Sequence, residues 1–282
     1  MPALPIVATI AQLRASIAAA RQSGARIGFV PTMGALHDGH LSLVHETQKR
    51  ADKVVVSIFV NPTQFAPHED FGRYPRMLEA DTAKLASAGG TDLIFAPSIS
   101  EMYPEGFATK VDVSGPSHGL ETDFRPHFFA GVGTVVAKLL LAAMPDIATF
   151  GEKDYQQLLV VRRLAIDLGL TVEIFGAPIV REPDGLAMSS RNAYLKPDER
   201  KIAGQLNAVL KRVIAALRGG EPIPAAEMEG KHALLKAGFA SVDYVAVRDA
   251  ASLASLDTLS HPARILAAAK VGATRLIDNM AV

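Results

Sequence analysis

The sequence predicts an α/β protein in which a doubly wound parallel sheet is followed by a smaller α+β domain. Short apolar runs bounded by turn residues recur along the first part of the chain, and helical patterns separate them. Continuous apolar runs of this length are typical of strands buried on both faces. Strands that alternate with helices imply right-handed βαβ units and therefore a parallel sheet. We expect the two domains to comprise residues 1–184 and 185–282, divided near the turn Pro183-Asp184-Gly185.

The elements of the first domain follow from these patterns in chain order. Thr9 can cap a first helix that ends near Gly24, because its hydroxyl can accept a hydrogen bond from an unpaired helix N–H group. Apolar runs predict strands at residues 27–30, 53–60, 91–96, 147–150, 171–175 and 179–180, and alternation predicts an edge strand at residues 109–114. One helix is expected to follow the H-x-G-H turn and to end at about Arg50, and others are expected at residues 77–88, 129–144 and 155–168. The helix at residues 129–144 should be packed on both faces, and residues 61–75 should form a loop.

The second domain is expected to combine helices with short strands. Residues 197–218 have the apolar spacing of one long amphipathic helix, which Gly219-Gly220-Glu221-Pro222 ends. A second helix is expected at residues 225–237, and short strands at residues 242–247, 264–270 and 275–279.

Composition excludes several classes of protein. Lys plus Arg and Asp plus Glu number 29 each, so a formal net charge of zero argues against a general nucleic-acid or membrane-surface binder. The absence of cysteine excludes disulfides and thiol chemistry and is compatible with the cytoplasm. The N-terminus lacks the basic and apolar regions of a signal peptide, and no apolar run is long enough to span a membrane. We therefore expect a soluble, cytoplasmic protein.

The organising motif is His37-Asp38-Gly39-His40, which lies between a predicted strand and a predicted helix. A helix N-terminus offers unpaired N–H groups and the positive end of the helix dipole, so it is a natural phosphate site. Two imidazoles there would add hydrogen-bond donors. Two other interpretations stay open. The histidines could simply cap the helix, or they could bind zinc, although no further compact cluster of metal ligands accompanies them.

Four polar clusters follow predicted strands, and ligands of an open parallel sheet bind beyond the carboxyl ends of its strands. Lys153 could meet phosphate oxygens, and Ser189-Ser190-Arg191 could cradle an anion. Neutral amides suit a hydroxy acid because they bind its carboxylate without neutralising it. Each cluster alone also fits an ordinary surface loop, but together they favour an active site. The clusters are Met33, His37 and His40; Asn61 and Gln64; Lys153, Asp154 and Gln157; and Met188, Ser189, Ser190 and Arg191.

Four stretches, VPTMGALHDGH, SIFVNPTQF, FGEKDYQQ and REPDGLAMSSRN, occur in this order. Together they resemble the pantothenate synthetases, or pantoate–β-alanine ligases, a family of the Rossmann-like H-x-G-H nucleotidyltransferases. Each motif alone is weak, whereas the combination is specific and covers residues 26–195. The resemblance implies ATP-dependent condensation of (R)-pantoate with β-alanine to pantothenate, through a pantoyl-adenylate, with release of AMP and pyrophosphate.

The resemblance also implies roles for individual residues. His40 would be the catalytic acid, acting with His37, Lys153, Ser189, Ser190 and Arg191. Pantoate would bind Gln64 and Gln157, with Asn61 and Met33 beside it, and Gln64 would also touch β-alanine. Asp81 would help to hold Mg²⁺, and a homodimer is expected. ATP would bind Met33, Gly34, Ala35, Leu36, His37, Asp38, Gly39, His40, Gly151, Glu152, Lys153, Asp154, Val180, Met188, Ser189, Ser190 and Arg191.

One position departs from the family pattern. The family usually reads R-P-x-H-F-x-G-V, whereas this chain has Phe128 in the histidine position and a histidine one place earlier, His127. His127 is therefore not among the expected site residues. Two rival functions stay open: a nucleotidylyltransferase that stops after adenylyl transfer, and a nucleotide-binding sensor without catalysis.

Overall fold

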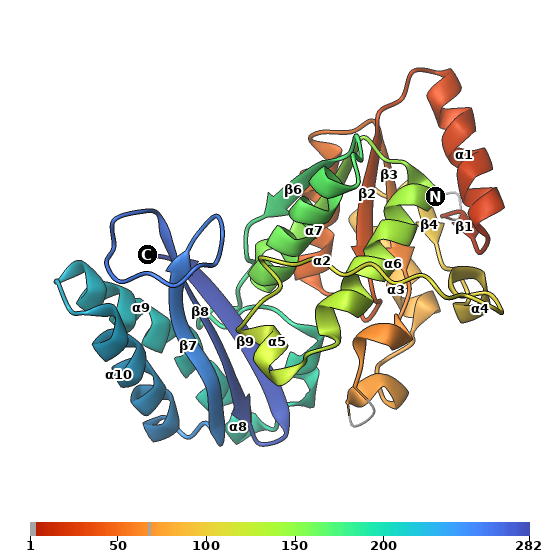
Figure 1. Ribbon diagram of the computed structural model, residues 1–282. Coiled ribbons are helices and arrows are strands. Elements are labelled where there is room, and N and C mark those ends of the chain that lie inside the picture. The colour runs from red at the N-terminus through yellow and green to blue at the C-terminus, as the bar shows by residue number, and fades with distance from the viewer. Residues whose placement is uncertain (1–3, 67–68) are drawn as a thin grey trace. The chain divides into compact units, whose positions relative to one another are not determined.

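The computed structural model describes residues 4–66 and 69–282, which form two compact units (Figure 1). The first unit comprises Met1–Glu152 and Val160–Pro178, and the second comprises Lys153–Leu159 and Ile179–Val282. Two positions of the expected loop at residues 61–75, and the first three positions of the N-terminus, lie outside the described residues.

The first unit is built on a six-stranded sheet in the order β1-β4-β3-β2-β5-β6, with every neighbouring pair parallel. After β1, which lies at the edge beside β4, the chain builds outward from β2 through β3 to β4, and it later returns to the other side of β2 with β5 and β6. The order therefore reverses beside β2, which confirms the predicted doubly wound sheet and places a switch point at the end of this strand. The strands are β1 (Ile6–Val7), β2 (Ile27–Thr32), β3 (Lys53–Ile58), β4 (Leu93–Phe95), β5 (Ile147–Gly151) and β6 (Glu173–Ala177).

Helices connect these strands, as the sequence predicts. Thr9 caps α1, since its side chain accepts a hydrogen bond from the Gln12 backbone N–H group. The helix α6 is buried on almost every side, as expected from its continuous apolar sequence. The helix α7 contributes its residues up to Leu159 to the second unit. The helices are α1 (Ile10–Gln22), α2 (Asp38–Gln48), α3 (Leu78–Ala88), α4 (Ile99–Met102), α5 (Glu121–Phe124), α6 (Phe128–Ala143) and α7 (Tyr155–Asp167).

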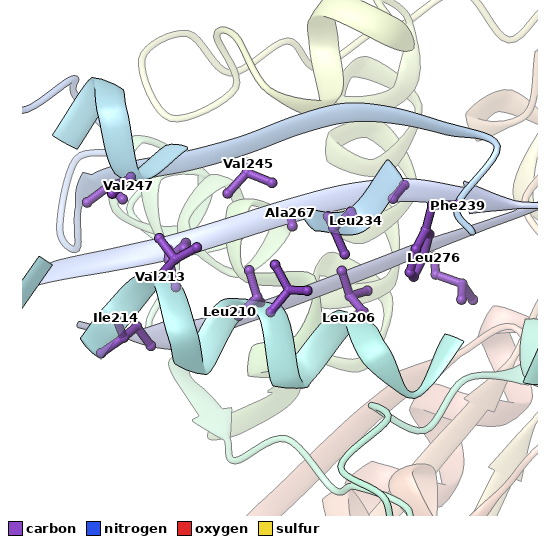
Figure 2. Packing of buried hydrophobic residues seen from close by; sticks show 14 of the residues in the cluster. Leu206, Leu210, Val213, Ile214, Leu234, Phe239, Val245, Val247, Ala267 and Leu276 are labelled. Atoms are coloured by element: carbon purple, nitrogen blue, oxygen red, sulfur yellow. The ribbon is translucent and has the colours of Figure 1, made fainter. Parts of the chain in front are cut away.

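The second unit packs helices against a three-stranded antiparallel sheet in the order β7-β8-β9. Leu206, Leu210 and Val213 of α9 lie against Val245 and Ala267 of the sheet (Figure 2). The spacing of these leucines and valines places them on one helix face, which explains the amphipathic pattern. The elements are α8 (Pro197–Ala203), α9 (Gln205–Arg218), α10 (Ile223–Lys236), β7 (Ser241–Asp249), β8 (Ala263–Val271) and β9 (Thr274–Ala281).

Three predictions about single elements are wrong. Residues 109–114 form no strand; the Val111 N–H group instead donates to the Thr134 hydroxyl at 2.9 Å. Residues 179–180 also form no strand, and only one antiparallel bridge joins Arg181 to Ala187. The predicted helix at residues 197–218 is two helices separated at Gly204, where an added Cβ would lie 2.4 Å from Asp184 Oδ2.

None of the helices in the described part of the chain is long and apolar enough to cross a membrane.

Candidate active site

The H-x-G-H motif lies where β2 passes into α2, at the switch point of the sheet. His37 is the N-cap of α2, with extended backbone angles, and Asp38 opens the first turn. The chain reaches this cap through a turn in which Gly34 has a φ of 79° and Ala35 a φ of 50°. The Gly34 N–H group donates to the Thr32 hydroxyl at 3.3 Å. The N–H groups at the start of α2 therefore lie beyond the carboxyl end of the central strand β2, where the ligands of such sheets bind.

Both histidines use Nδ1 to accept a backbone hydrogen bond. The Gly39 N–H group donates to His37 Nδ1 at 3.1 Å, and the His37 N–H group donates to His40 Nδ1 at 3.3 Å. A nitrogen that accepts a hydrogen bond carries no proton, so the neutral form of each ring has its proton on Nε2. The two rings lie 4.1 Å apart between centroids. The capping interpretation is thus confirmed, and the caps fix both rings as Nε2–H donors.

The helix α3 contacts the turn that precedes the histidines. Asp81, which has no exposed surface, accepts hydrogen bonds from the backbone N–H groups of Ala35 at 2.9 Å and Leu36 at 2.8 Å. Lys84 Nζ donates to the Leu36 carbonyl oxygen at 2.6 Å. Both carboxylate oxygens of Asp81 are therefore engaged by the protein backbone. Within the described residues, no group of three or more His, Asp or Glu side chains could hold a metal ion, so a zinc site at the histidines has no support there.

Gln64 ends a short 3₁₀ turn, η1 (Pro62–Gln64), that follows β3. Its Nε2 lies 2.9 Å from Met33 Sδ, which joins the expected pantoate residues to the H-x-G-H turn. Asn61 is 1% exposed, and its Nδ2 donates to Gln64 Oε1 and to the Gly131 carbonyl oxygen, both at 3.2 Å. Met33, Asn61 and Gln64 are thus brought together in the first unit, with Asn61 buried behind Gln64.

Further residues that the motifs did not single out support this turn. The Tyr103 hydroxyl donates to Asn61 Oδ1 at 2.7 Å, and burial raises the pKa of Tyr103. Arg125 forms a bidentate ion pair with Glu69 at 2.6 and 2.7 Å, and it also donates to the Gln64 carbonyl oxygen at 3.2 Å. Their partners lie 42 to 61 residues away along the chain, so no local pattern could have indicated these contacts.

His127 and Phe128, where this chain departs from the family pattern, lie at the start of α6. Phe128 is buried, and the Arg125 guanidinium lies over its ring at 3.9 Å from the centroid. Its neighbour His127 has a buried Nε2 with no hydrogen-bond partner among the described residues. Phe128 therefore supports Arg125 through a cation–π contact.

The other residues expected to bind ATP belong to the second unit, except for Gly151 and Glu152, which belong to the first. Those in the second unit are Lys153, Asp154, Val180, Met188, Ser189, Ser190 and Arg191. Lys153 lies in the short turn η3 (Glu152–Asp154), and its carbonyl oxygen accepts a hydrogen bond from Asn279 Nδ2 at 2.8 Å. Its ammonium lies 3.7 Å from Asp154 Oδ2. Gln157 lies in α7 and is half-buried.

The loop that carries the two serines is closed by backbone and side-chain hydrogen bonds. The Met188 N–H group donates to the Val180 carbonyl oxygen at 3.0 Å, so these two expected nucleotide residues are adjacent. Ser189 caps the turn η4 (Ser190–Tyr194), because its hydroxyl accepts a hydrogen bond from the Arg191 N–H group at 3.2 Å. Ser190 and Arg191 follow in the first positions of that turn, so the loop presents hydroxyl, N–H and guanidinium groups together.

Arg181 and Asp278 hold this loop to the sheet of the second unit. The guanidinium of Arg181 contacts both carboxylate oxygens of Asp278, at 2.8 and 2.9 Å, and Asp278 is almost fully buried. Arg200 forms ion pairs with Asp184 and Glu182 and holds the pKa of Asp184 below its ordinary value. These pairs hold the segment that leads into Met188 to Arg191.

Comparisons with known proteins agree with the motifs and the fold. The pantothenate synthetase of Paramagnetospirillum magneticum is 58% identical over 280 residues, which cover 99% of this chain and 98% of that protein. That of Rhodopseudomonas palustris strain HaA2 is 55% identical over the full length of both. A crystal structure of the Thermus thermophilus enzyme matches with a TM-score of 0.92 at 49% identity, covering 98% of each chain.

A second solved structure carries ligands. The pantoate–β-alanine ligase of Francisella tularensis, solved with beta-gamma ATP and β-alanine, matches with a TM-score of 0.82 at 34% identity, covering 99% of this chain and 98% of that chain. The family model described as pantoate-beta-alanine ligase matches residues 5–281. The chain therefore belongs to the pantoate–β-alanine ligase family.

Proposed function

We propose that this ligase condenses pantoate with β-alanine in two steps, through a pantoyl-adenylate. A carboxylate does not react with an amine at neutral pH, because its oxygen is a poor leaving group. In the first step a pantoate carboxylate oxygen attacks the α-phosphorus of ATP, and the bond to the bridging oxygen breaks to release pyrophosphate. In the second step the β-alanine amine attacks the acyl carbon, AMP leaves with the former carboxylate oxygen, and the amine loses a proton.

The observation that carries this proposal is the pair of Nε2–H donors at the N-terminus of α2. Charge accumulates on phosphate oxygens as pyrophosphate leaves, and preorganised donors aimed at that charge stabilise the transition state. Hydrogen bonds to Nδ1 hold the rings of His37 and His40 in place, which supports this proposed role. Residues of the second unit, Lys153 and the loop of Ser189, Ser190 and Arg191, are proposed as further phosphate ligands on the strength of the family motif.

Pantoate is proposed to bind the amides of Gln64 and Gln157. Neutral amides hydrogen-bond its hydroxyl and carboxylate and leave the carboxylate nucleophilic. Met33, in contact with Gln64, would border both substrates. Asn61 is engaged on its donor and acceptor sides by the protein, so its proposed contribution is to orient Gln64.

Magnesium is proposed to enter with ATP and to be held by the phosphate oxygens and by waters, since Mg²⁺ usually keeps several waters when it binds substrate phosphates. Asp81, the expected ligand, does not fit this role, because it is fully buried and both of its oxygens accept backbone hydrogen bonds.

Further proposals concern the domains, the cellular location and the assembly, and of these only the homodimer rests on the family resemblance. Residues 1–184 would form the domain that binds nucleotide and pantoate, and residues 185–282 would form a lid that protects the adenylate from water. The ligase would act in the cytoplasm. It would form a homodimer, and light scattering of the purified protein would test this oligomeric state.

Pyrophosphate release measured with and without β-alanine tests the proposed function. With ATP and pantoate alone, we expect a stoichiometric burst of pyrophosphate, and β-alanine should convert the burst into steady turnover with equal AMP. Steady pyrophosphate release that is indifferent to β-alanine would favour an adenylyl transferase. ATP binding without any pyrophosphate release would favour a sensor.

A further inference from the structure

We propose that Asp81 and Lys84 of α3 are positioning residues that hold the turn before the H-x-G-H motif in the conformation that ATP requires. This inference rests on the proposed function of that motif. It gives Asp81 a task other than metal binding, and it gives Lys84, which no motif indicated, a task in the reaction.

The hydrogen bonds of Asp81 define a clamp on two successive backbone N–H groups. Oδ2 accepts from Ala35 and Oδ1 accepts from Leu36, so one carboxylate fixes two consecutive peptide groups. Hydrogen bonds to a charged acceptor are stronger than neutral ones, and the complete burial of Asp81 excludes competing water. Rotation of either peptide would break a bond that no solvent could replace.

Lys84 supplies the complementary contact from the same helix face. Its Nζ donates to the Leu36 carbonyl oxygen at 2.6 Å. Residues three apart on a helix lie on one face, so Asp81 and Lys84 reach the turn together. Leu36 is thus held at its N–H group by Asp81 and at its carbonyl group by Lys84.

The turn needs such support because its backbone is strained. Ala35 adopts a left-handed conformation, with φ at 50°, that residues with a Cβ rarely adopt. Gly34 precedes it with φ at 79°, and a Cβ there would lie 2.9 Å from Asp81 Oδ2. Strained residues persist where the surroundings determine their conformation. The Asp81 carboxylate therefore packs against the turn as closely as a glycine allows.

The histidines depend on this turn directly. Leu36 is bonded to His37, and the His37 N–H group is the one that orients His40 through Nδ1. A shift of the Leu36 peptide moves the His37 N–H group, and with it the fixed tautomer and direction of the His40 ring. Misplacement of a catalytic group by about 1 Å can cost about 100-fold in rate.

The test uses Asp81→Asn, which keeps the size of the side chain but places an amide NH₂ group against one of the two backbone N–H donors. We expect kcat/KM for ATP to fall by about 10- to 100-fold, with the KM for pantoate within about twofold of wild type. Asp146→Asn is the matched control. The Asp146 carboxylate accepts a hydrogen bond from the Ile27 N–H group at 2.7 Å. Ile27 begins β2, at the end of the strand opposite to the turn that Asp81 holds, so this variant should leave kcat/KM for ATP and the KM for pantoate unchanged.

ATP binding measured by calorimetry in EDTA separates positioning from metal binding. A positioning role predicts that Asp81→Asn weakens ATP binding about tenfold without metal, because the displaced turn misplaces its phosphate donors. A metal ligand would instead leave metal-free binding unchanged and raise the Mg²⁺ concentration needed for half-maximal activity. The second result would overturn the proposal. This binding measurement needs no turnover. It therefore tests the positioning role even if the protein binds ATP but does not catalyse the proposed reaction.

Lys84→Met gives an independent result if Asp81→Asn does not fold, because Lys84 is an exposed residue whose loss leaves no buried charge. We expect a smaller loss in the same parameter, kcat/KM for ATP, and partial recovery in Lys84→Arg, which retains a donor. The positioning role would be refuted by a folded Lys84→Met variant that has wild-type kcat, KM and ATP affinity. This holds if Asp81→Asn is equally unaffected, and also if Asp81→Asn does not fold.

Discussion

Gly131→Ala should damage pantoate binding, although Gly131 is not among the expected substrate residues. Gly131 lies in α6, behind the turn that carries Gln64. A Cβ added there would lie 2.3 Å from the Thr63 carbonyl oxygen, 2.6 Å from the Thr63 carbonyl carbon and 2.8 Å from the Gln64 backbone nitrogen. All three atoms belong to the backbone, so no flexible side chain can yield. The turn itself must move.

The size of the displacement follows from these distances. Ordinary van der Waals contact begins near 3.4 Å, so the Thr63 oxygen must retreat by about 1 Å. Gln64 follows the next peptide group and would move with it. A misplacement of about 1 Å can cost about 100-fold in rate, so we expect kcat/KM for pantoate to fall by about that factor. The methyl group should meanwhile favour the helix by up to about 1 kcal/mol, which works against unfolding.

Steady-state kinetics with pantoate as the varied substrate measure this effect, and calorimetry measures ATP affinity in parallel. Gly133→Ala is the control, since it adds the same group to the same helix but faces the Val111 carbonyl oxygen, at 3.0 Å, far from Gln64 in the sequence. The control should keep wild-type kinetics. A folded Gly131→Ala variant with unchanged KM and kcat for pantoate would refute the reasoning.

Three further predictions concern single side chains. His40→Ala and Lys153→Ala should each lower turnover by about 100- to 1,000-fold while circular dichroism stays native; near wild-type turnover in either variant would remove its proposed role. Gln64→Ala should weaken pantoate binding by about 1–3 kcal/mol and leave ATP binding unchanged, as calorimetry would show; the reverse pattern would place Gln64 at the nucleotide. Because Arg200 lowers the pKa of Asp184 in the folded state, wild type should be more stable in urea than Asp184→Asn above about pH 5. This advantage should shrink as the pH falls below about 4 towards the lowered pKa; an advantage of the same size at every pH would contradict this.

Much of the sheet could be predicted because its central strands are buried on both faces. Residues such as Phe29 and Val56 have no exposed surface, and so their strands read as continuous apolar runs. The strand β1 contains two residues, too few for any pattern. The alternation at residues 109–114 was misleading because an irregular segment can also turn alternate residues inward and pair its N–H groups with a side chain.

The chemistry-bearing residues of the site could be predicted, whereas the residues that hold them could not. The H-x-G-H spacing is local, so the sequence places both histidines at a helix start. Asp81, by contrast, contacts backbone N–H groups 45 and 46 residues away, and a sequence motif cannot distinguish such a carboxylate from a metal ligand. The same holds for Tyr103 and Arg125, whose contacts with the Gln64 turn depend entirely on tertiary structure.

The route through an acyl-adenylate is tested most directly by following oxygen atoms from pantoate. Pantoate labelled with ¹⁸O in its carboxylate is incubated with ATP and β-alanine for a limited time, and the nucleotides and phosphates are analysed by mass spectrometry. Adenylation predicts one labelled oxygen in AMP, because the attacking oxygen stays on phosphorus when the amine displaces it. Label in orthophosphate, with ADP as the nucleotide product, would show an acyl-phosphate and contradict the mechanism.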